Sequence, residues 1–319
     1  MSKSLRIVFM GTPEFAVATL DALLKSRHTV VGVVTVPDKP ANRGLKLQAS
    51  AVKEFAVQHN IPVLQPEKLK NEEFIKALKA LNPDLQVVVA FRMLPEIVWA
   101  LPEYGTINLH ASLLPQYRGA APINWAIING EKETGITTFF ISHQIDTGDI
   151  LQREKVPIND DDDAGIVHDK LMALGAELVV KTVDSIADNI IHPIKQEAET
   201  VLKAAPKIFR ENCKINWNKS AEEVYNLIRG LSPYPGAWTE IANDKGDKTS
   251  LKIYKTAKSL ATSLPMGTIA VNDKNQLLVG CSEGSIEIIE LQAEGKKRMK
   301  AVDFLRGFPI NQKNWKAIS

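Results

Sequence analysis

Cysteine is scarce, because the 319-residue chain has only Cys213 and Cys281. Two cysteines cannot form a disulfide framework, and no Cys/His spacing matches a zinc site, so we expect no metal. The chain also lacks an apolar run of the roughly 18 residues that a membrane span needs. Its first residues have no signal-peptide pattern. We therefore expect a cytoplasmic protein with no membrane partner.

Two nucleotide-binding motifs are missing as well. The first apolar run, 5–10, is followed by "GTPEF" rather than by G-x-G-x-x-G, and no Walker loop is present. The sequence therefore indicates a protein that binds neither NAD nor ATP, although the rest of its first half is typical of a nucleotide-binding architecture.

Strand and helix signals alternate through the first half. The apolar runs are continuous, which predicts a Rossmann-like α/β domain with a mostly parallel sheet covered on both faces. Thr12 is expected to cap the first helix, with Pro13 at its first position. The loop 37–47 is expected to form neither helix nor strand. Strands are predicted at 5–10, 28–36, 84–91, 105–110, 135–142 and 149–158, and helices after Thr12 and at 50–60, 71–80, 121–130 and 164–189.

The second part of the chain differs from the first. After the connector 190–212 and a helix at 220–231, short strand-like runs at 249–257, 267–271, 276–281 and 285–292 predict a small β-barrel. We predict a first domain at 1–190, a linker at 191–212 and a second domain at 213–319.

Charge is unevenly divided between the two parts. Residues 1–202 hold 20 Lys and Arg against 25 Asp and Glu, whereas residues 203–319 hold 19 against 12. The basic second part predicts an anionic partner. Its sequence "GKKRMK" predicts phosphate contacts, with a solvated charge run as the alternative. The residues concerned are Lys296, Lys297, Arg298 and Lys300.

One polar stretch follows a predicted strand in mid-domain. Asn108 and His110 are two residues apart on that strand, so both side chains point to the same face, at the carboxyl end where α/β sheets place their sites. A tight turn in "HQIDTGDIL" could bring Asp146 beside His110. An amide, an imidazole and a carboxylate suit acyl transfer to an amine. The Asn108 amide could donate a hydrogen bond to the developing oxyanion, and His110 could carry a proton from the attacking amine to the leaving one. The Asp146 carboxylate could orient the imidazole.

Other interpretations of these residues remain open. A Ser-His-Asp triad would use Ser112, but the G-x-S-x-G elbow is missing. A strand histidine can be structural, and an Asp-x-Gly turn can be only a turn. The acidic run 160–163 precedes a long helix. We therefore interpret it as negative charge that complements the helix dipole, rather than as a metal site. The remaining histidines are read as structural: His28, His59, His143, His168 and His192.

The stretch "NLHASLLPQYRG" with "DTGDIL" downstream resembles the signature of the folate-dependent formyltransferases. The segments "FMGTPEFA", "PDKPANRGLKL", "SPYPGAW" and "LQAEGKKRM" extend the resemblance over nearly the whole chain, to the branch that formylates methionyl-tRNA. The resemblance implies a 10-formyltetrahydrofolate donor and an initiator methionyl-tRNA acceptor. It implies catalytic Asn108, His110 and Asp146, a folate site at Ser112, Leu113, Leu114 and Pro115, and tRNA contacts from Lys39, Arg43 and Lys46. It also implies that 1–190 is a formyltransferase catalytic domain and that 213–319 is an OB-like tRNA-binding domain.

The chain departs from the family pattern at "AFRMLP", where Arg92 stands in place of the usual glycine. This departure concerns the shape of the pterin pocket and not the catalytic trio. Two other functions remain possible. One is a formyltransferase that acts on an amino-sugar nucleotide. The other is an RNA-binding protein with an inactive site, against which the joint presence of Asn108, His110 and Asp146 argues.

Overall fold

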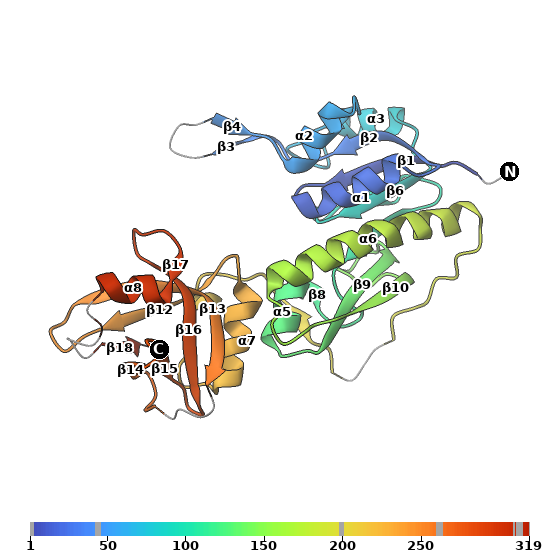
Figure 1. Cartoon of the computed structure of the whole chain (residues 1–319). Helices are drawn as coiled ribbons and strands as arrows, with labels where there is room; N and C mark the ends of the chain where they lie inside the picture. The colour runs from blue at the N-terminus through green and yellow to red at the C-terminus, as the bar shows by residue number, and fades with distance from the viewer. Residues whose placement is uncertain are drawn as a thin grey trace. The chain divides into compact units, whose positions relative to one another are not determined.

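The computed structural model describes residues 3–41, 46–197, 201–259, 264–308, 310 and 315–318 (Figure 1). Contacts divide the chain into two compact units, which are described separately. Unit 1 comprises Met1–Gly119, Thr134–Pro157 and His168–Ala204, and unit 2 comprises Ala120–Glu133, Ile158–Val167 and Ala205–Ser319. The sequential domain boundaries proposed from the sequence stay a prediction.

Unit 1 contains a seven-stranded sheet in the order β10-β9-β7-β6-β1-β2-β5. Four neighbouring pairs in it are parallel, while β7 and β9 are antiparallel. The predicted mostly parallel sheet is therefore confirmed. Its strands are β1 (Arg6–Gly11), β2 (Thr29–Val34), β5 (Val63–Leu64), β6 (Leu85–Val89), β7 (Thr106–His110), β9 (Glu133–Phe140) and β10 (Ile150–Pro157).

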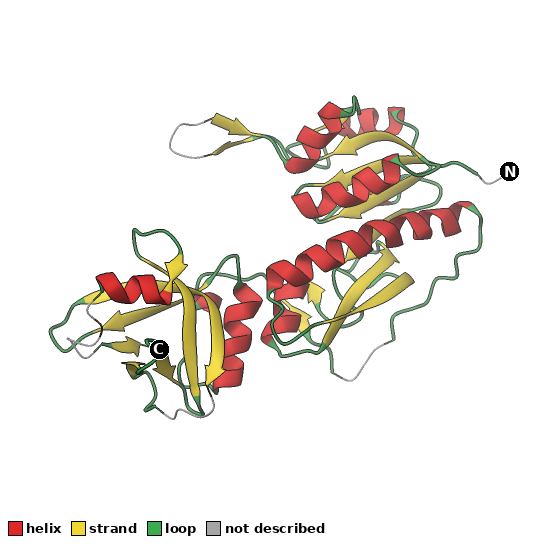
Figure 2. Cartoon of the chain, in the orientation of Figure 1, coloured by secondary structure: helices red, strands yellow, loops and turns green. Residues whose placement is uncertain are grey.

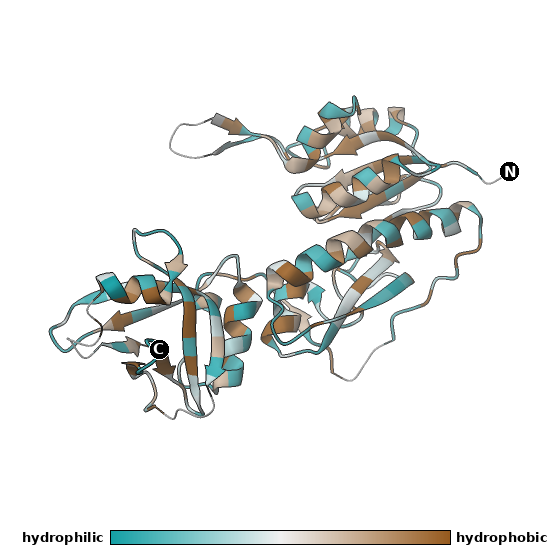
Figure 3. Ribbon diagram, viewed as in Figure 1, coloured by the Kyte–Doolittle hydropathy of each residue, from teal (hydrophilic) through white to brown (hydrophobic). Residues whose placement is uncertain are grey.

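The central strands of this sheet are its most deeply buried part. All five residues of β6 are buried, as are the last five of β1. Figure 3 colours the chain by hydropathy and shows hydrophobic residues along the strands of this sheet. Burial of both faces accounts for the continuous apolar runs, because a strand covered on both sides has no solvent face to carry polar residues. Among the described residues, no helix is long and apolar enough to cross a membrane.

Helices connect and cover these strands (Figure 2). Ser50 and Asn71 cap α2 and α3 by accepting backbone N–H groups with their side chains. The prediction for the first helix is wrong: Pro13 itself is the N-cap residue of α1, and no side chain caps it. The helices of this unit are α1 (Glu14–Leu24), α2 (Ala51–Gln58), α3 (Glu72–Ala80), α4 (Glu96–Trp99) and most of α6 (Ala164–Ala187). Helix α5 (Pro122–Ile128) belongs to unit 2.

The loop 37–47 is not free of regular structure, contrary to expectation. Lys39–Ala41 (β3) and Lys46–Gln48 (β4) pair as an antiparallel hairpin, with Pro40 opposite Leu47. A two-stranded hairpin has only edge strands, where proline can lack an N–H without breaking a ladder. At its base, Asp38 accepts hydrogen bonds from Lys53 and Gln65.

Unit 2 is built around an antiparallel sheet in the order β14-β15-β16-β13-β12-β18. A bridge between Thr268 and Lys316 joins its two ends, so the sheet nearly closes and the predicted small barrel is confirmed. Its elements are α7 (Ala221–Leu231), β12 (Ala237–Ala242), β13 (Lys248–Ser259), β14 (Ile269–Val271), β15 (Leu277–Gly280), β16 (Ser285–Ala293), β17 (Met299–Lys300), α8 (Ala301–Gly307) and β18 (Lys316–Ile318).

His28 couples the stability of unit 1 to pH. Its Nδ1 accepts a hydrogen bond from the Leu5 backbone N–H at 3.1 Å, and its Nε2 lies 3.1 Å from Asp184 Oδ1. Burial lowers the pKa of His28 and outweighs the opposing attraction of Asp184. The unfolded chain therefore takes up the proton first. The stability contributed by His28 is complete above about pH 6.5 and is lost as the pH falls through the folded pKa.

We expect the melting temperature to drop between about pH 7.5 and about pH 5 more in the wild type than in His28→Asn. The asparagine oxygen can accept from Leu5 in place of Nδ1, but it does not titrate. Thermal melts of both proteins at the two pH values measure the difference. An identical pH dependence would contradict the assignment.

Candidate functional site

Asn108 and His110 lie on one face of β7. The register sets Asn108 opposite Phe139 and His110 opposite Thr137 on β9. Leu109, between them, points the other way: a Cβ on Gly175 of α6 would lie 2.7 Å from its side chain. The two polar side chains therefore share the sheet face away from α6, as the alternation of a strand requires. Asn108 is half-buried and His110 is buried.

Both ring nitrogens of His110 have a defined neighbour. Nε2 lies 2.8 Å from the carbonyl oxygen of Tyr117, which can only accept, so Nε2 carries a proton. Nδ1 faces Asp146, with 3.8 Å between Nδ1 and Oδ2. That distance is too long for a hydrogen bond but close enough for the carboxylate to stabilise positive charge on the ring. Nδ1 is therefore the nitrogen available to gain and lose a proton.

The turn that carries Asp146 is tightly held. Asp146 has a φ of 54°, a left-handed conformation that is uncommon for a residue other than glycine. Its Oδ2 accepts the backbone N–H of Gly119 at 2.9 Å, which fixes the carboxylate direction. Gly148 is required two residues later, because a Cβ there would lie 1.7 Å from the Phe140 carbonyl oxygen. The predicted Asp-Thr-Gly turn thus brings a carboxylate beside His110.

Two residues that the sequence interpretation missed hold this turn. The Gln196 side-chain amide donates to the carbonyls of Asp146 and Gly148, at 2.9 and 2.8 Å. Its Oε1 accepts from the Arg118 guanidinium at 2.6 and 3.1 Å. Arg118 is the arginine of "QYRG" in the signature stretch, so the sequence could have marked it as a site residue. Gln196 lies in the connector, where no periodic pattern points to it. Together they clamp the Asp146 turn.

We expect Gln196→Ala to lower kcat by about tenfold without abolishing activity, because the positive-φ turn loses two hydrogen bonds and positions Asp146 less well. A matched control is Gln144→Ala, in the same loop but outside this clamp. Steady-state kinetics of the two variants would measure the difference. Equal kcat values for the two variants would mean that the clamp does not position Asp146.

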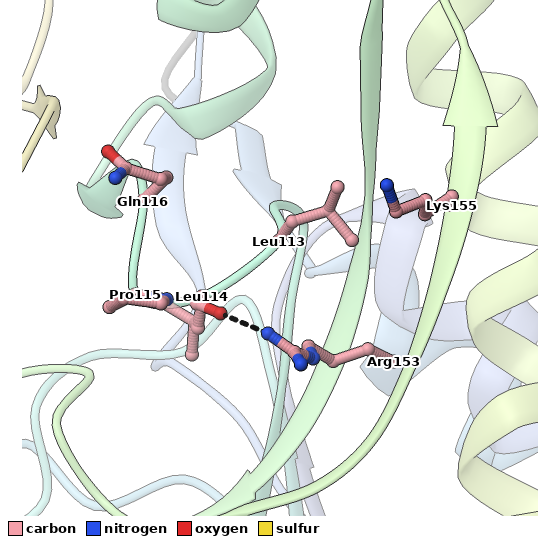
Figure 4. A pocket seen from close by; sticks show the side chains of 6 residues that line it. All are labelled: Leu113, Leu114, Pro115, Gln116, Arg153 and Lys155. Atoms are coloured by element: carbon pink, nitrogen blue, oxygen red, sulfur yellow. Dashed lines mark hydrogen bonds between the residues drawn. The ribbon is translucent and has the colours of Figure 1, made fainter. Parts of the chain in front are cut away.

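The expected folate segment Ser112–Pro115 follows β7 as a folded loop. Ser112 and Leu114 are fully buried, and the Ser112 hydroxyl donates to the Gln116 carbonyl at 2.7 Å. Arg153 Nη1 donates to the Leu114 carbonyl at 2.9 Å (Figure 4). Beside the loop lies a pocket of about 500 Å³ with one apolar wall and two cations. It is lined by Leu113, Leu114, Pro115, Gln116, Arg153 and Lys155.

Arg92, the departure from the family pattern, holds a neighbouring loop. Its guanidinium donates to the Glu67 carbonyl at 2.8 Å and to the Pro66 carbonyl. It also lies over the Phe91 ring, 5.6 Å from the centroid. Arg92 therefore fixes the loop after β6 to the segment after β5, a contact that a glycine could not make.

The expected tRNA-contacting residues fall in both units. Lys39 is exposed on the β3–β4 hairpin, and Lys46 lies on β4. Arg43 lies outside the described residues. In unit 2, Lys296, Lys297 and Arg298 are exposed around the turn between β16 and β17.

The acidic run 160–163 makes contacts typical of a helix start. Asp163 Oδ1 accepts the backbone N–H of Ile166 at 2.9 Å, as a capping side chain does. In the part of the chain that the structure describes, no three His, Cys, Asp or Glu side chains gather as metal ligands do.

Two sequence families match the chain. Residues 5–183 match the family described as formyl transferase, and residues 207–309 match the formyl transferase C-terminal domain. Among curated relatives, the methionyl-tRNA formyltransferase of Bacteroides thetaiotaomicron is 54% identical over 313 residues, which cover 97% of each chain.

Two solved structures share the fold. The sugar 3N-formyl transferase WlaRD, solved with dTDP and 5-N-formyl-THF, has a TM-score of 0.65 at 22% identity, covering 92% of this chain and 100% of its own. HypX from Aquifex aeolicus, in complex with tetrahydrofolic acid, has a TM-score of 0.64 at 17% identity, covering 95% of this chain and 47% of its own.

Proposed function

The chain belongs to the methionyl-tRNA formyltransferase family, and we propose that Asn108, His110 and Asp146 carry out its formyl transfer. The reaction moves a formyl group from 10-formyltetrahydrofolate to the amino group of methionyl initiator tRNA. The observation that carries the proposal is the position of His110 Nδ1, 3.8 Å from Asp146, on the face of β7 that also bears Asn108.

Each of the three side chains has one part in the reaction. As the amine attacks the formyl carbon, negative charge develops on the formyl oxygen, and the Asn108 amide donates to that oxygen. His110 Nδ1 takes a proton from the attacking amine and returns it to N10 of the folate as the carbon–N10 bond breaks. Asp146 stabilises the positive ring in between. The products are the formylated amine and tetrahydrofolate, and no enzyme nucleophile is needed.

We also propose which residues bind each substrate. We assign the Ser112–Pro115 loop to the folate donor, because its apolar pocket wall suits an aromatic ring. The segment 37–47, with Lys39, Arg43 and Lys46 in its sequence, is assigned to tRNA. The Lys53 ammonium pairs with Asp38 and lowers the pKa of its carboxyl, and Lys39 beside it is exposed.

We also infer that the protein works in the cytoplasm, because its acceptor is a charged tRNA used to start protein synthesis. Fractionation of the source cells should then recover the formylating activity outside the membrane pellet. Activity that sediments with membranes would contradict this inference.

Formyl transfer from 10-formyltetrahydrofolate tests the function directly. The purified protein should formylate methionyl initiator tRNA, and uncharged tRNA should inhibit competitively. An amino-sugar nucleotide, the acceptor class of the alternative function, should be neither formylated nor inhibitory. Formylation of the sugar nucleotide without formylation of methionyl-tRNA would overturn the proposal. Binding of tRNA without any turnover would instead favour an RNA-binding protein.

A further inference from the structure

Part of the connector runs along the loops of the candidate active site. The structure describes its residues 194–197 and 201–204, which we call the connector strap. A linker that only tethers two domains leaves the hydrogen-bonding groups of its backbone to water. Here Ile194 and Ile150, the first residue of β10, instead exchange two backbone hydrogen bonds of 2.8 Å. The strap is therefore docked onto unit 1.

The second part of the strap holds a polar neighbour of His110. The Tyr117 carbonyl, which accepts from His110 Nε2 at 2.8 Å, belongs to a buried residue with a φ of 59°. A left-handed backbone is uncommon for a residue other than glycine and has to be stabilised by its surroundings. The backbone N–H of Tyr117 donates to the Lys203 carbonyl at 2.6 Å. The direction of the Tyr117 carbonyl therefore depends on the strap.

The Gln116 side chain fastens this part of the strap to the loop after β7. Its Oε1 accepts the backbone N–H of Lys203 at 2.8 Å, and its Nε2 donates to the Val201 carbonyl at 3.2 Å. Figure 4 shows this side chain pointing away from Arg153 and Lys155. A substitution of Gln116 therefore changes the attachment of the strap and leaves the two cations of the pocket in place.

The Tyr117 carbonyl decides which nitrogen of the neutral His110 ring carries the proton. A carbonyl oxygen can only accept, so it keeps the proton on Nε2. Nδ1 faces the Asp146 carboxylate, which is also only an acceptor and would attract a proton on Nδ1 if Nε2 lost its partner. In that second tautomer, Nδ1 has no lone pair with which to take a proton from an amine. The active tautomer therefore depends on the position of the Tyr117 carbonyl.

We propose that the connector strap selects the active tautomer of His110, with Gln116 and Gln196 as positioning residues. The strap fixes the Tyr117 carbonyl at Nε2, and through Gln196 it fixes the turn that carries Asp146 at Nδ1. The inference rests on the proposed function only for the reaction that this tautomer serves. A ring held in one tautomer before substrate binds needs no rearrangement when the proton moves.

The tautomer can be measured from the ¹⁵N chemical shifts of the imidazole, in the full-length protein without substrate at about pH 8, where an ordinary histidine is neutral. In the wild type, His110 should show an unprotonated Nδ1 and a protonated Nε2. Gln116→Met has a similar size but makes neither hydrogen bond to the strap. It should move the two shifts toward each other as the second tautomer becomes populated. Unchanged shifts would overturn the proposal.

The other histidines and a conservative variant supply the controls. Signals missing from His110→Ala identify the ring of interest, and signals missing from His28→Asn identify His28. Nδ1 of His28 is held by the Leu5 N–H, so its shifts should stay unchanged in Gln116→Met and show that unit 1 is intact. Gln116→Glu keeps an oxygen that accepts from Lys203, so it should retain the wild-type shifts of His110. If Gln116→Glu instead behaved like Gln116→Met, the contact with Lys203 would not set the tautomer.

Kinetics separate a positioning role from a general structural one. With both substrates saturating, Gln116→Met should lower kcat for formylation of methionyl-tRNA about tenfold. In the His110→Ala background the same substitution should have no further effect, because its role passes through that ring. Gln58→Met, at the exposed last residue of α2, is the matched control and should change neither the shifts nor kcat. An equal loss in both backgrounds would overturn the positioning role.

The two measurements also distinguish failure of this inference from failure of the proposed function. A wild type that formylates methionyl-tRNA, together with a Gln116→Met variant that keeps the wild-type shifts and kcat, would reject the strap alone. A changed tautomer in Gln116→Met, in a protein that does not formylate methionyl-tRNA, would reject the function alone.

Discussion

Replacing His110 with alanine should lower kcat by about 10²–10⁴-fold, the range for loss of a general acid–base group. The physical reason is that Nδ1 is the ring nitrogen free to exchange a proton, since Nε2 donates to the Tyr117 carbonyl. KM for both substrates should change little, because the imidazole acts on the reacting atoms rather than on the bulk of either substrate. Single-turnover formylation of methionyl-tRNA would measure the loss.

The double variant with Asp146→Asn shows whether the two side chains act as a unit. If Asp146 acts through His110, the double variant should be no slower than His110→Ala alone. Losses that multiply would mean that Asp146 has a separate role. A matched control is His143→Ala, an exposed histidine near Glu96 that has no part in the proposed reaction. Near-normal turnover in His110→Ala would remove it from the mechanism.

The parts of the site that follow local rules could be predicted from the sequence. Strand alternation alone puts Asn108 and His110 on one face, and the parallel topology puts their end of β7 at the edge where sites form. The Asp146 turn needed only two adjacent strand signals and an Asp-Thr-Gly sequence. For these residues, spacing of two or three positions decides the geometry.

The missing parts depend on contacts between distant segments. Gln196 reaches Asp146 from 50 residues away, and no local pattern encodes that distance. The sequence does not predict β12, because two of its buried residues are Ala237 and Thr239. Buried and less buried side chains alternate along this strand, but its buried side chains are only weakly hydrophobic. The sequence does not reveal the β3–β4 hairpin, because Pro40 disfavours a central strand, whereas a two-stranded hairpin has only edge strands.

Replacing Asn108, the proposed oxyanion donor, with alanine should lower kcat by about 10²–10³-fold. In the part of the chain that the structure describes, no hydrogen bond engages the Asn108 amide, so its two N–H groups are available to a substrate oxygen. The loss should appear in kcat rather than in KM, because the donor meets a full negative charge only in the transition state.

A second substitution at this position separates donation from shape. Asn108→Asp keeps the size of the side chain but replaces its N–H donors with a carboxylate, which accepts hydrogen bonds and repels an oxyanion. It should therefore be at least as slow as Asn108→Ala, even though the alanine leaves a larger gap. If Asn108→Asp instead retained most of the wild-type kcat, the amide would be filling space, and stabilisation of the oxyanion would have to come from another donor.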